Sequence, residues 1–408
     1  MKNKVKVILI VIAFFALAVS YYLCNEYFGI SSKIEVNASS DNFASKYIVN
    51  VPYKNSVAYI ALQDDSIIYM EFKDSDSIFY RHSIVENTTI EIGVIPNFVI
   101  SAGFAILSGE SLYNQITVRG NDPKVNYGFK NVLYKIDLDK NSLSQITSDT
   151  EYLPAAYIYP YKNKILSLYA KRSSNHFTAF MTVFDINKKQ FTSKSKDYVL
   201  DENSYKGNRI VNCCTSGELI YALTIESSVD VNSQSTVNAN NHTTIKVLNE
   251  AFELINEIEL GEDVLALIAN SRVGTMRVFG DFIFMRNYSG NGLIGLIENN
   301  SIKTLLIDPE LDMAVNPNQQ ELPRFFKRHT NKYYTIDEQN KCINEMELEI
   351  KEGYSILSML SSGEYSYVHL TNYDLERLVL YIPNSSFLTQ KQTEKRNLLE
   401  LISRFLEG

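Results

Sequence analysis

The sequence predicts an all-β fold, and three observations support this prediction. Short runs rich in Val, Ile, Tyr, Phe and Thr recur from Lys46 onward, separated by Asn, Asp, Ser, Lys and Gly. This pattern is typical of β-strands joined by turns. Many of the runs come in pairs with a short polar turn inside each pair. Tyr and Phe, which favour strands, are abundant at 27 and 21 residues.

The first set of strands gives the clearest pattern. Four consecutive strands are expected, at Val57–Leu62, Ser66–Phe72, Ser77–Ser83 and Thr88–Ile95. The segments between them are short and rich in Asp, Ser and Asn, so neighbouring strands are expected to pair as an antiparallel meander.

The paired strands repeat along the chain. Units of strand, polar turn and strand begin near residues 77, 131, 176, 243 and 292, with gaps of 54, 45, 67 and 49 residues. A meander repeated at this spacing predicts a β-propeller, because each meander buries its faces only by stacking against its neighbours. We expect six or seven four-stranded blades, with seven favoured. A pair of β-sandwiches is the alternative, and the lack of a break in mid-chain disfavours it.

An N-terminal strand often completes the last blade of a propeller and removes its exposed edge. Lys46–Val51 (KYIVNV) is well placed for that role. The array resembles bacterial surface and periplasmic propellers in general. Because the resemblance rests on the recurring meander and on no family motif, it transfers no functional residues.

An apolar run without charge extends from Val7 to Cys24 and follows three lysines. As a helix rising about 1.5 Å per residue it would reach about 27 Å, close to the ~30 Å hydrocarbon core of a bilayer. The basic flank predicts a cytoplasmic N-terminus and an extracytoplasmic body. Cleavage after Ala18 is an alternative, opposed by the continuation of the run. Lipidation of Cys24 is another, opposed by Leu23 before it.

The predicted organisation has five parts. Residues 1–6 are cytoplasmic, 7–24 form a transmembrane signal-anchor, 25–45 are a linker, 46–390 form the propeller and 391–408 form a C-terminal helix. This last helix is predicted because its apolar residues share one face, namely Leu398, Leu399, Ile402, Phe405 and Leu406. It is expected to dock on the propeller rim, with membrane or partner contact as alternatives.

The charge composition limits the classes of partner that the protein is expected to bind. The net charge is −8 with both signs interspersed, which disfavours a nucleic-acid partner because such proteins carry a basic patch. The expected partners are the membrane, through the N-terminal helix, and a protein, peptide or glycan ligand. Polar insertions at Arg119–Lys130 and Ser227–His242 are expected to be loops that leave the scaffold.

No residue stands out as a catalytic, cofactor-binding or metal-binding group. The four cysteines form no CxxC pair, and Cys213 and Cys214 are expected to be core residues, with a vicinal disulfide as the alternative. The five histidines are scattered, without the clustering that metal sites need. They are His82, His176, His242, His329 and His369.

Other polar motifs have ordinary structural explanations. Asp64–Asp65 and Asp74–Asp76 are expected to be solvated turn acids, because a calcium loop would need a central Gly and a final Glu. Ser216 and Ser362 lack the preceding Gly of a nucleophile elbow. Ser289–Gly292 is expected to be a tight turn.

Tyrosine clusters are the most distinctive content of the chain. They comprise Tyr157, Tyr159 and Tyr161, the adjacent Tyr333 and Tyr334, and Tyr365 with Tyr367. Such clusters suit sugar stacking and protein contacts, but strand packing alone also favours Tyr and is the preferred explanation.

These features together predict a membrane-anchored extracytoplasmic propeller. We expect a non-enzymatic binding or scaffolding module for a protein, peptide or glycan, located at the cell membrane. The alternative is an extracellular hydrolase or lyase acting on carbohydrate or peptide, with its site on the propeller axis.

Overall fold

The computed structural model describes residues 57–384, except for gaps at 74–75, 97–98, 103–104, 109–110, 120–128, 150–152, 173–175, 202–206, 228–240, 271–272, 319–320, 349, 351 and 375–376. The predicted transmembrane run, the linker, Lys46–Val51 and the C-terminal helix lie outside these residues, as does most of both insertions. Within the described part of the chain, no helix is long and apolar enough to cross a membrane.

The described strands confirm the all-β prediction and form consecutive antiparallel meanders. The first meander contains β1 (Val57–Gln63), β2 (Ser66–Lys73), β3 (Asp76–Ser83) and β4 (Thr88–Pro96). The second contains β5 (Val99–Ala102), β6 (Ile106–Ser108), β7 (Ser111–Arg119), β8 (Phe129–Asp137) and β9 (Ser142–Asp149). β5 and β6 both pair with β7, so together they act as one interrupted strand.

Three further meanders follow. The third contains β10 (Leu153–Tyr161), β11 (Lys164–Arg172), β12 (His176–Asp185), β13 (Gln190–Lys194) and β14 (Tyr198–Asp201). The fourth contains β15 (Gly207–Ser216), β16 (Leu219–Ser227), β17 (Asn241–Leu248) and β18 (Leu254–Glu259). The fifth contains β19 (Val273–Phe279), β20 (Phe282–Asn287), β21 (Gly292–Glu298) and β22 (Ser301–Asp308).

The last two meanders complete the described fold. The sixth contains β23 (Leu311–Met313), β24 (Arg324–Lys327), β25 (Lys332–Asp337) and β26 (Cys342–Glu347). The seventh contains β27 (Ser355–Ser361), β28 (Tyr365–Thr371) and β29 (Arg377–Pro383).

Hydrogen bonding groups these strands into five sheets, because the third, fourth and fifth meanders merge into one 13-stranded sheet. The connections that merge them are narrow. One is a single antiparallel pair between Leu200 and Gly207, and the other is a single parallel pair between Glu259 and Ser301. Each meander therefore remains a separate pairing unit within the larger sheet.

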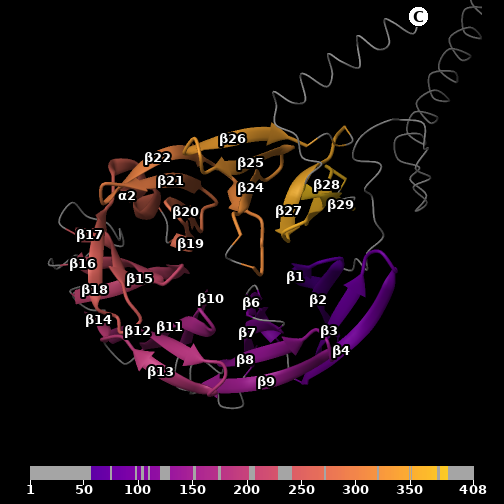
Figure 1. The fold of residues 1–408 in the computed structure, drawn as a ribbon, viewed down its shortest axis with the longest axis horizontal. Coiled ribbons are helices and arrows are strands. Elements are labelled where there is room, and N and C mark those ends of the chain that lie inside the picture. The colour runs from indigo at the N-terminus through magenta and orange to yellow at the C-terminus, as the bar shows by residue number, and fades with distance from the viewer. Residues whose placement is uncertain are drawn as a thin grey trace, which may run out of the picture.

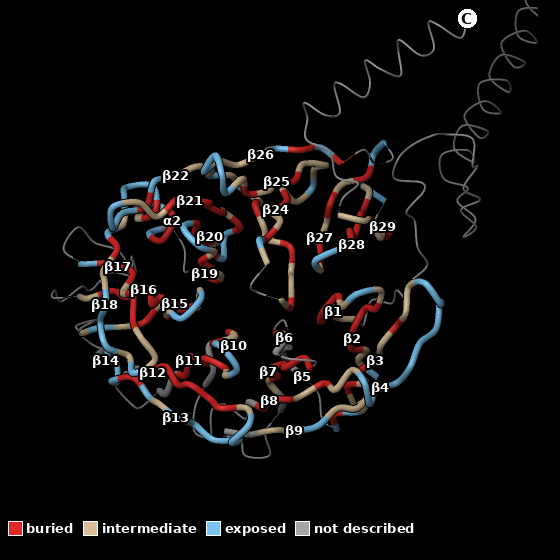
Figure 2. The backbone as a smooth tube through the Cα atoms, viewed as in Figure 1, coloured by how far each residue is buried: buried red, intermediate tan, exposed pale blue. Residues whose placement is uncertain are grey.

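The meanders stand around a central space in a propeller-like ring (Figure 1). Strands β1, β6, β10, β15, β19 and β27 lie nearest the centre, and β4, β9, β13, β18, β22 and β26 lie at the outside. Figure 2 shows the outer strand β4 as mainly exposed. All five units predicted from the repeat are the two outer strands of a meander, so the repeat is confirmed as a structural one.

Apolar side chains hold neighbouring meanders together. Between the fifth and sixth, for example, the Phe284 and Phe325 rings lie 5.1 Å apart and both are fully buried. Burying one such side chain contributes about 1.5–3 kcal/mol. Because every meander has a neighbour on each side, interior strands such as β2 and β20 are buried along most of their length, whereas the outer strand β4 is not.

The seam between the first and seventh meanders is rich in tyrosine. Tyr59 and Tyr367 pack with ring centres 5.5 Å apart, and Tyr365 and Tyr381 stack at 4.6 Å. The Tyr381 hydroxyl donates to the Asp64 backbone oxygen at 3.1 Å. The predicted Tyr365–Tyr367 cluster therefore packs in the seam, which agrees with the preferred explanation of strand packing.

One helix departs from the predicted strand pattern. Helix α2 (Glu262–Asn270) connects β18 to β19. Its acidic first turn, Glu262 and Asp263, suits the positive end of the helix dipole. Val264, Leu267 and Ile268 share one face and are buried, which is the spacing of an amphipathic helix.

Candidate functional site: an axial cavity

The connection between β23 and β24 enters the central space of the ring (Figure 1). We call residues 314–323 the axial segment; residues 319–320 within it are not described. The segment starts beside β27, where Val315 forms an isolated parallel bridge with Leu360. The Val315 N–H donates to the Met359 oxygen at 3.0 Å, and the Val315 oxygen accepts from the Ser361 N–H at 2.8 Å.

The far end of the axial segment reaches the opposite side of the ring. There the Leu107 N–H of β6 donates to the Pro317 oxygen at 2.8 Å. Figure 2 shows a buried stretch at this end of the connection, beside β6. The axial segment therefore ties the sixth meander to the seventh and the second.

Side chains within the axial segment fix its turn. The Asn316 and Asn318 side-chain amides each donate to one oxygen of Glu321, both at 2.8 Å. The Asn318 N–H also donates to the Asn316 side-chain oxygen at 2.9 Å. Both oxygens of Glu321 are therefore engaged by the segment itself.

A cavity of about 50 Å³ lies beside the axial segment. At roughly 10–15 Å³ for each water, this volume holds a few water molecules or one small polar group. Strand β19, strand β23 and the axial segment line it, through Thr275, Arg277, Phe279, Asp312, Met313, Ala314, Val315, Asn316, Asn318, Glu321 and Pro323. We call it the axial cavity.

The charged wall of the axial cavity on β19 is Arg277, which is buried. Its guanidinium lies over the Tyr159 ring, 4.5 Å from the ring centre, in a cation–π contact. The Tyr159 hydroxyl donates to the Asn212 side-chain oxygen at 3.0 Å, and the Asn212 amide donates to the Gly274 oxygen at 3.3 Å. Strands β10 and β15 therefore support this wall from behind.

The second acidic group of the cavity, Asp312, is held by cations from two meanders. The Arg328 Nε donates to Asp312 at 2.9 Å, and Arg286 pairs with the same carboxylate oxygen at 3.6 Å. The other oxygen of Asp312 accepts from the Met313 N–H at 2.9 Å. Both carboxylates that line the cavity thus have fixed structural partners.

None of the four histidines whose side chains the structure describes lines the axial cavity. His369 is buried in β28, where burial lowers its pKa to about 4. His242 lies 3.5 Å from Glu257, and His82 contacts the Thr89 hydroxyl at 2.9 Å. Throughout the described ranges, no three His, Cys, Asp or Glu side chains are grouped so that they could hold a metal ion.

The remaining motifs lie in structural positions. Cys213 and Cys214 are fully buried in β15 as thiols, so the core-residue interpretation is confirmed. Burial raises the pKa of both, that of Cys214 to about 12. The Asp65 carboxylate accepts from the Ser66 and Ser83 hydroxyls, both at 3.0 Å, as a turn acid does.

The serine motifs also lie at turns. Gly217, beside Ser216, has a φ of 57° in the turn between β15 and β16, and Gly290 has a φ of 95° in the predicted turn between β20 and β21. The Ser362 hydroxyl accepts from the Tyr365 N–H at 3.3 Å.

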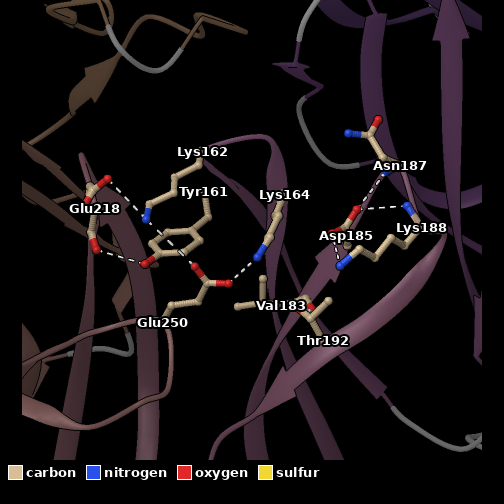
Figure 3. Close-up of polar contacts among 10 residues, drawn as sticks. All are labelled: Tyr161, Lys162, Lys164, Val183, Asp185, Asn187, Lys188, Thr192, Glu218 and Glu250. Carbon is tan, nitrogen blue, oxygen red and sulfur yellow. Dashed lines mark hydrogen bonds and ion pairs between the residues drawn. The ribbon is translucent and has the colours of Figure 1, made fainter.

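A second polar cluster joins the third and fourth meanders (Figure 3). Lys162 pairs with Glu218 at 3.2 Å, and Lys164 pairs with Glu250. The Tyr161 hydroxyl donates to the Glu218 backbone oxygen at 3.0 Å. Tyr161, part of a predicted tyrosine cluster, thus serves an inter-meander contact.

Comparison with known proteins adds no family to these observations. No protein-family model matches the chain, and no curated protein matches it. Solved structures that resemble it include an uncharacterized protein from Listeria monocytogenes, at 12% identity over 82% of this chain and 97% of the other, with a TM-score of 0.46.

Two other similar structures have named activities. An oligogalacturonate lyase from Vibrio parahaemolyticus is 10% identical over 84% of this chain and 92% of its own, with a TM-score of 0.48. The β-propeller domain of the trilobed protease from Pyrococcus furiosus is 10% identical over 83% and 96%, also with a TM-score of 0.48. Similarity at this level transfers neither an activity nor a residue role, and the propeller-like arrangement rests on the strand pairing described above.

Proposed function

We propose that the seven meanders are the blades of one seven-bladed propeller that helix 7–24 and linker 25–45 hold outside the membrane. In this proposal the protein is a binding module, and its ligand is the polar end of a glycan or peptide that enters the axial cavity.

The proposal rests on one observation, which is that both carboxylates lining the cavity already have partners within the fold. Asp312 is paired with Arg286 and Arg328, and Glu321 accepts from two asparagine amides. The partners of both carboxylates lie within the fold, whereas a general acid or base must lie within hydrogen-bond reach of the reacting group. The arrangement therefore favours recognition over proton transfer.

The chemistry of the lining favours a ligand with both hydroxyl and carbonyl groups. Thr275 and the two asparagines can donate and accept, while Arg277 donates only. Phe279 offers an apolar surface beside them. Sugar hydroxyls and peptide termini present this mixture of donors, acceptors and short apolar faces.

An array experiment tests the proposed function directly. The full chain in detergent would be applied to immobilised glycans and peptides, next to a Thr275→Trp variant in which the larger side chain fills the axial cavity. We expect the wild-type chain to bind one class of ligand and the variant to lose that binding while circular dichroism shows that it remains folded. Equal binding by both would contradict the proposed site.

The enzyme alternative has one observation in its favour, since two carboxylates and an arginine line one cavity. Incubating the full chain with polysaccharides and peptides, followed by mass spectrometry of products, separates the two functions. Turnover that is lost in Glu321→Gln, with binding retained, would establish a hydrolase or lyase and replace the binding proposal.

A further inference from the structure

Among the described residues, the seventh meander has one strand fewer than the four-stranded first, fourth, fifth and sixth meanders. Its sheet contains only β27, β28 and β29 among the residues that the structure describes, and β29 is at the end of that sheet. The seven residues of β29 pair with β28 in unbroken register, from Arg377 opposite Thr371 to Pro383 opposite Tyr365. The opposite edge of β29 is therefore positioned to receive one more strand.

Burial along β29 resembles that of an interior strand. Leu378, Val379, Leu380 and Ile382 are all at most 9% exposed. The outer strands of other meanders differ: every residue of β13 and β18 except Ile258 is half-buried or exposed. A strand this apolar at a sheet edge would be an aggregation site, and proteins normally cover such edges.

The neighbouring first meander leaves apolar surface at the same place. Val94 of β4 is 44% exposed and pairs across the strands with Ile78 of β3, which is half-buried. Cross-strand partners lie on one face of a sheet, so these two side chains form one apolar strip. Ile78 and Tyr80 are two residues apart on β3 and share this face, and Tyr80 packs against the buried side chains of the seam, which include Tyr367 and Val379.

We propose that Lys46–Val51 is the fourth strand of the seventh meander, paired antiparallel with β29 and packed against the apolar strip of the first meander. The chain order supports this occupant. In the first six meanders the outermost strand precedes the innermost strand of the next, and the segment before β1 has that position for the seventh. The connection of residues 52–56 falls between the two-residue link of 309–310 and the seven-residue link of 348–354.

The competing occupant is the chain that follows β29, and Asn384 limits where that chain could turn back. The Asn384 N–H donates to the Glu364 oxygen at 2.7 Å, and its side-chain amide donates to the Ser362 oxygen at 2.8 Å. Both contacts hold the chain at the turn between β27 and β28, away from the outer edge of β29. A return along that edge could therefore begin only after Asn384.

This strand would make the segment that follows the predicted membrane helix part of the propeller itself. The polypeptide leading from the predicted membrane helix would enter the fold at the ring's seam, so the last blade would be complete only with residues near the tether attached. The inference does not depend on the ligand proposed for the axial cavity. A test of strand pairing alone decides it.

Hydrogen exchange of the full chain tests the proposal through the β29 amides that do not bond to β28. We expect them to be protected in the wild-type chain and to exchange at least about tenfold faster in Val49→Pro, because proline disrupts the pairing of Lys46–Val51 and leaves the β29 amides without their carbonyl acceptors. The matched control, Val36→Pro in the linker, should leave them unchanged. If Val49→Pro unfolds the whole chain, shown by faster exchange in β20 and β21, Val49→Ala should give a smaller change confined to β29.

Three outcomes would overturn the proposal. β29 amides that exchange rapidly in the wild-type chain would show an open edge. Protection that survives Val49→Pro but disappears when residues 385–408 are deleted would assign the edge to the C-terminal segment. Protection that rises with protein concentration would assign it to a second copy of the chain.

Discussion

Replacing His369 should remove part of the loss in unfolding free energy that the protein undergoes at acid pH. His369 lies buried in β28 with the Tyr59 ring edge-on, 6.1 Å between ring centres, and burial lowers its pKa from 6.5 to about 4. Because the unfolded chain binds this proton at higher pH than the folded chain does, unfolding is favoured as pH falls through that interval. From these two values, the linkage relation predicts a loss of about 2 kcal/mol at pH 5 and about 3 kcal/mol at pH 4, relative to pH 7.5.

The assay is urea unfolding of the full chain at a series of pH values from 7.5 to 4, with His369→Gln alongside. The difference between wild type and variant isolates the histidine, because every other titrating group is shared. His329→Gln, at the turn between β24 and β25, is the matched control and should behave like wild type. If wild type and His369→Gln lose stability in parallel from pH 6.5 to 4, the reasoning about burial of this ring is wrong.

Three further substitutions probe the axial segment, the seam and a packed strand pair. Glu321→Ala removes the acceptor of two asparagine amides and should lower the unfolding free energy by about 1–3 kcal/mol, whereas the exposed Glu352→Ala should leave urea midpoints unchanged. Tyr381→Phe keeps the ring stack but loses the hydroxyl contact across the seam, so calorimetry should show a loss of about 0.5–1.5 kcal/mol; no change would mean the contact is absent in solution. Gly295→Ala would place a Cβ 2.6 Å from a methyl of Ile302 and should cost about 1–3 kcal/mol; a fully stable variant would contradict the packing of β21 on β22.

The repeating strands could be predicted from the sequence because local pattern and tertiary role agree there. The run Ser66–Phe72 is apolar with polar turns on both sides, and the structure extends β2 only to Lys73. Short β-rich runs between turn formers keep the same assignment whichever neighbours they acquire. The prediction of paired outer strands succeeded for this reason.

Other elements carried weaker signals. The strands β5–β7 were not predicted, although Gly103 and the run Ser108–Ser111 are turn formers between their apolar residues. Helix α2 is short, and only the spacing of Val264, Leu267 and Ile268 together with its acidic first turn marks it.

The axial cavity could not be predicted because its parts are far apart in the sequence. Arg277 and Asp312 each lie in a strand whose local pattern indicates packing alone. Their convergence depends on which strands face the ring's centre, and that follows from closure of the whole array. The run Asn316–Pro317–Asn318 was the one available sign, since it is turn-forming and lies between two short strands.

Ligand binding by the full chain, compared between wild type and Thr275→Trp, tests most directly whether the ring's axis is a recognition site. Calorimetric titration with the best array ligand should give saturable binding to wild type, no heat of binding to the variant, and no product by mass spectrometry. Equal affinity for both proteins, with both shown to be folded, would place recognition elsewhere on the propeller and contradict the axial site.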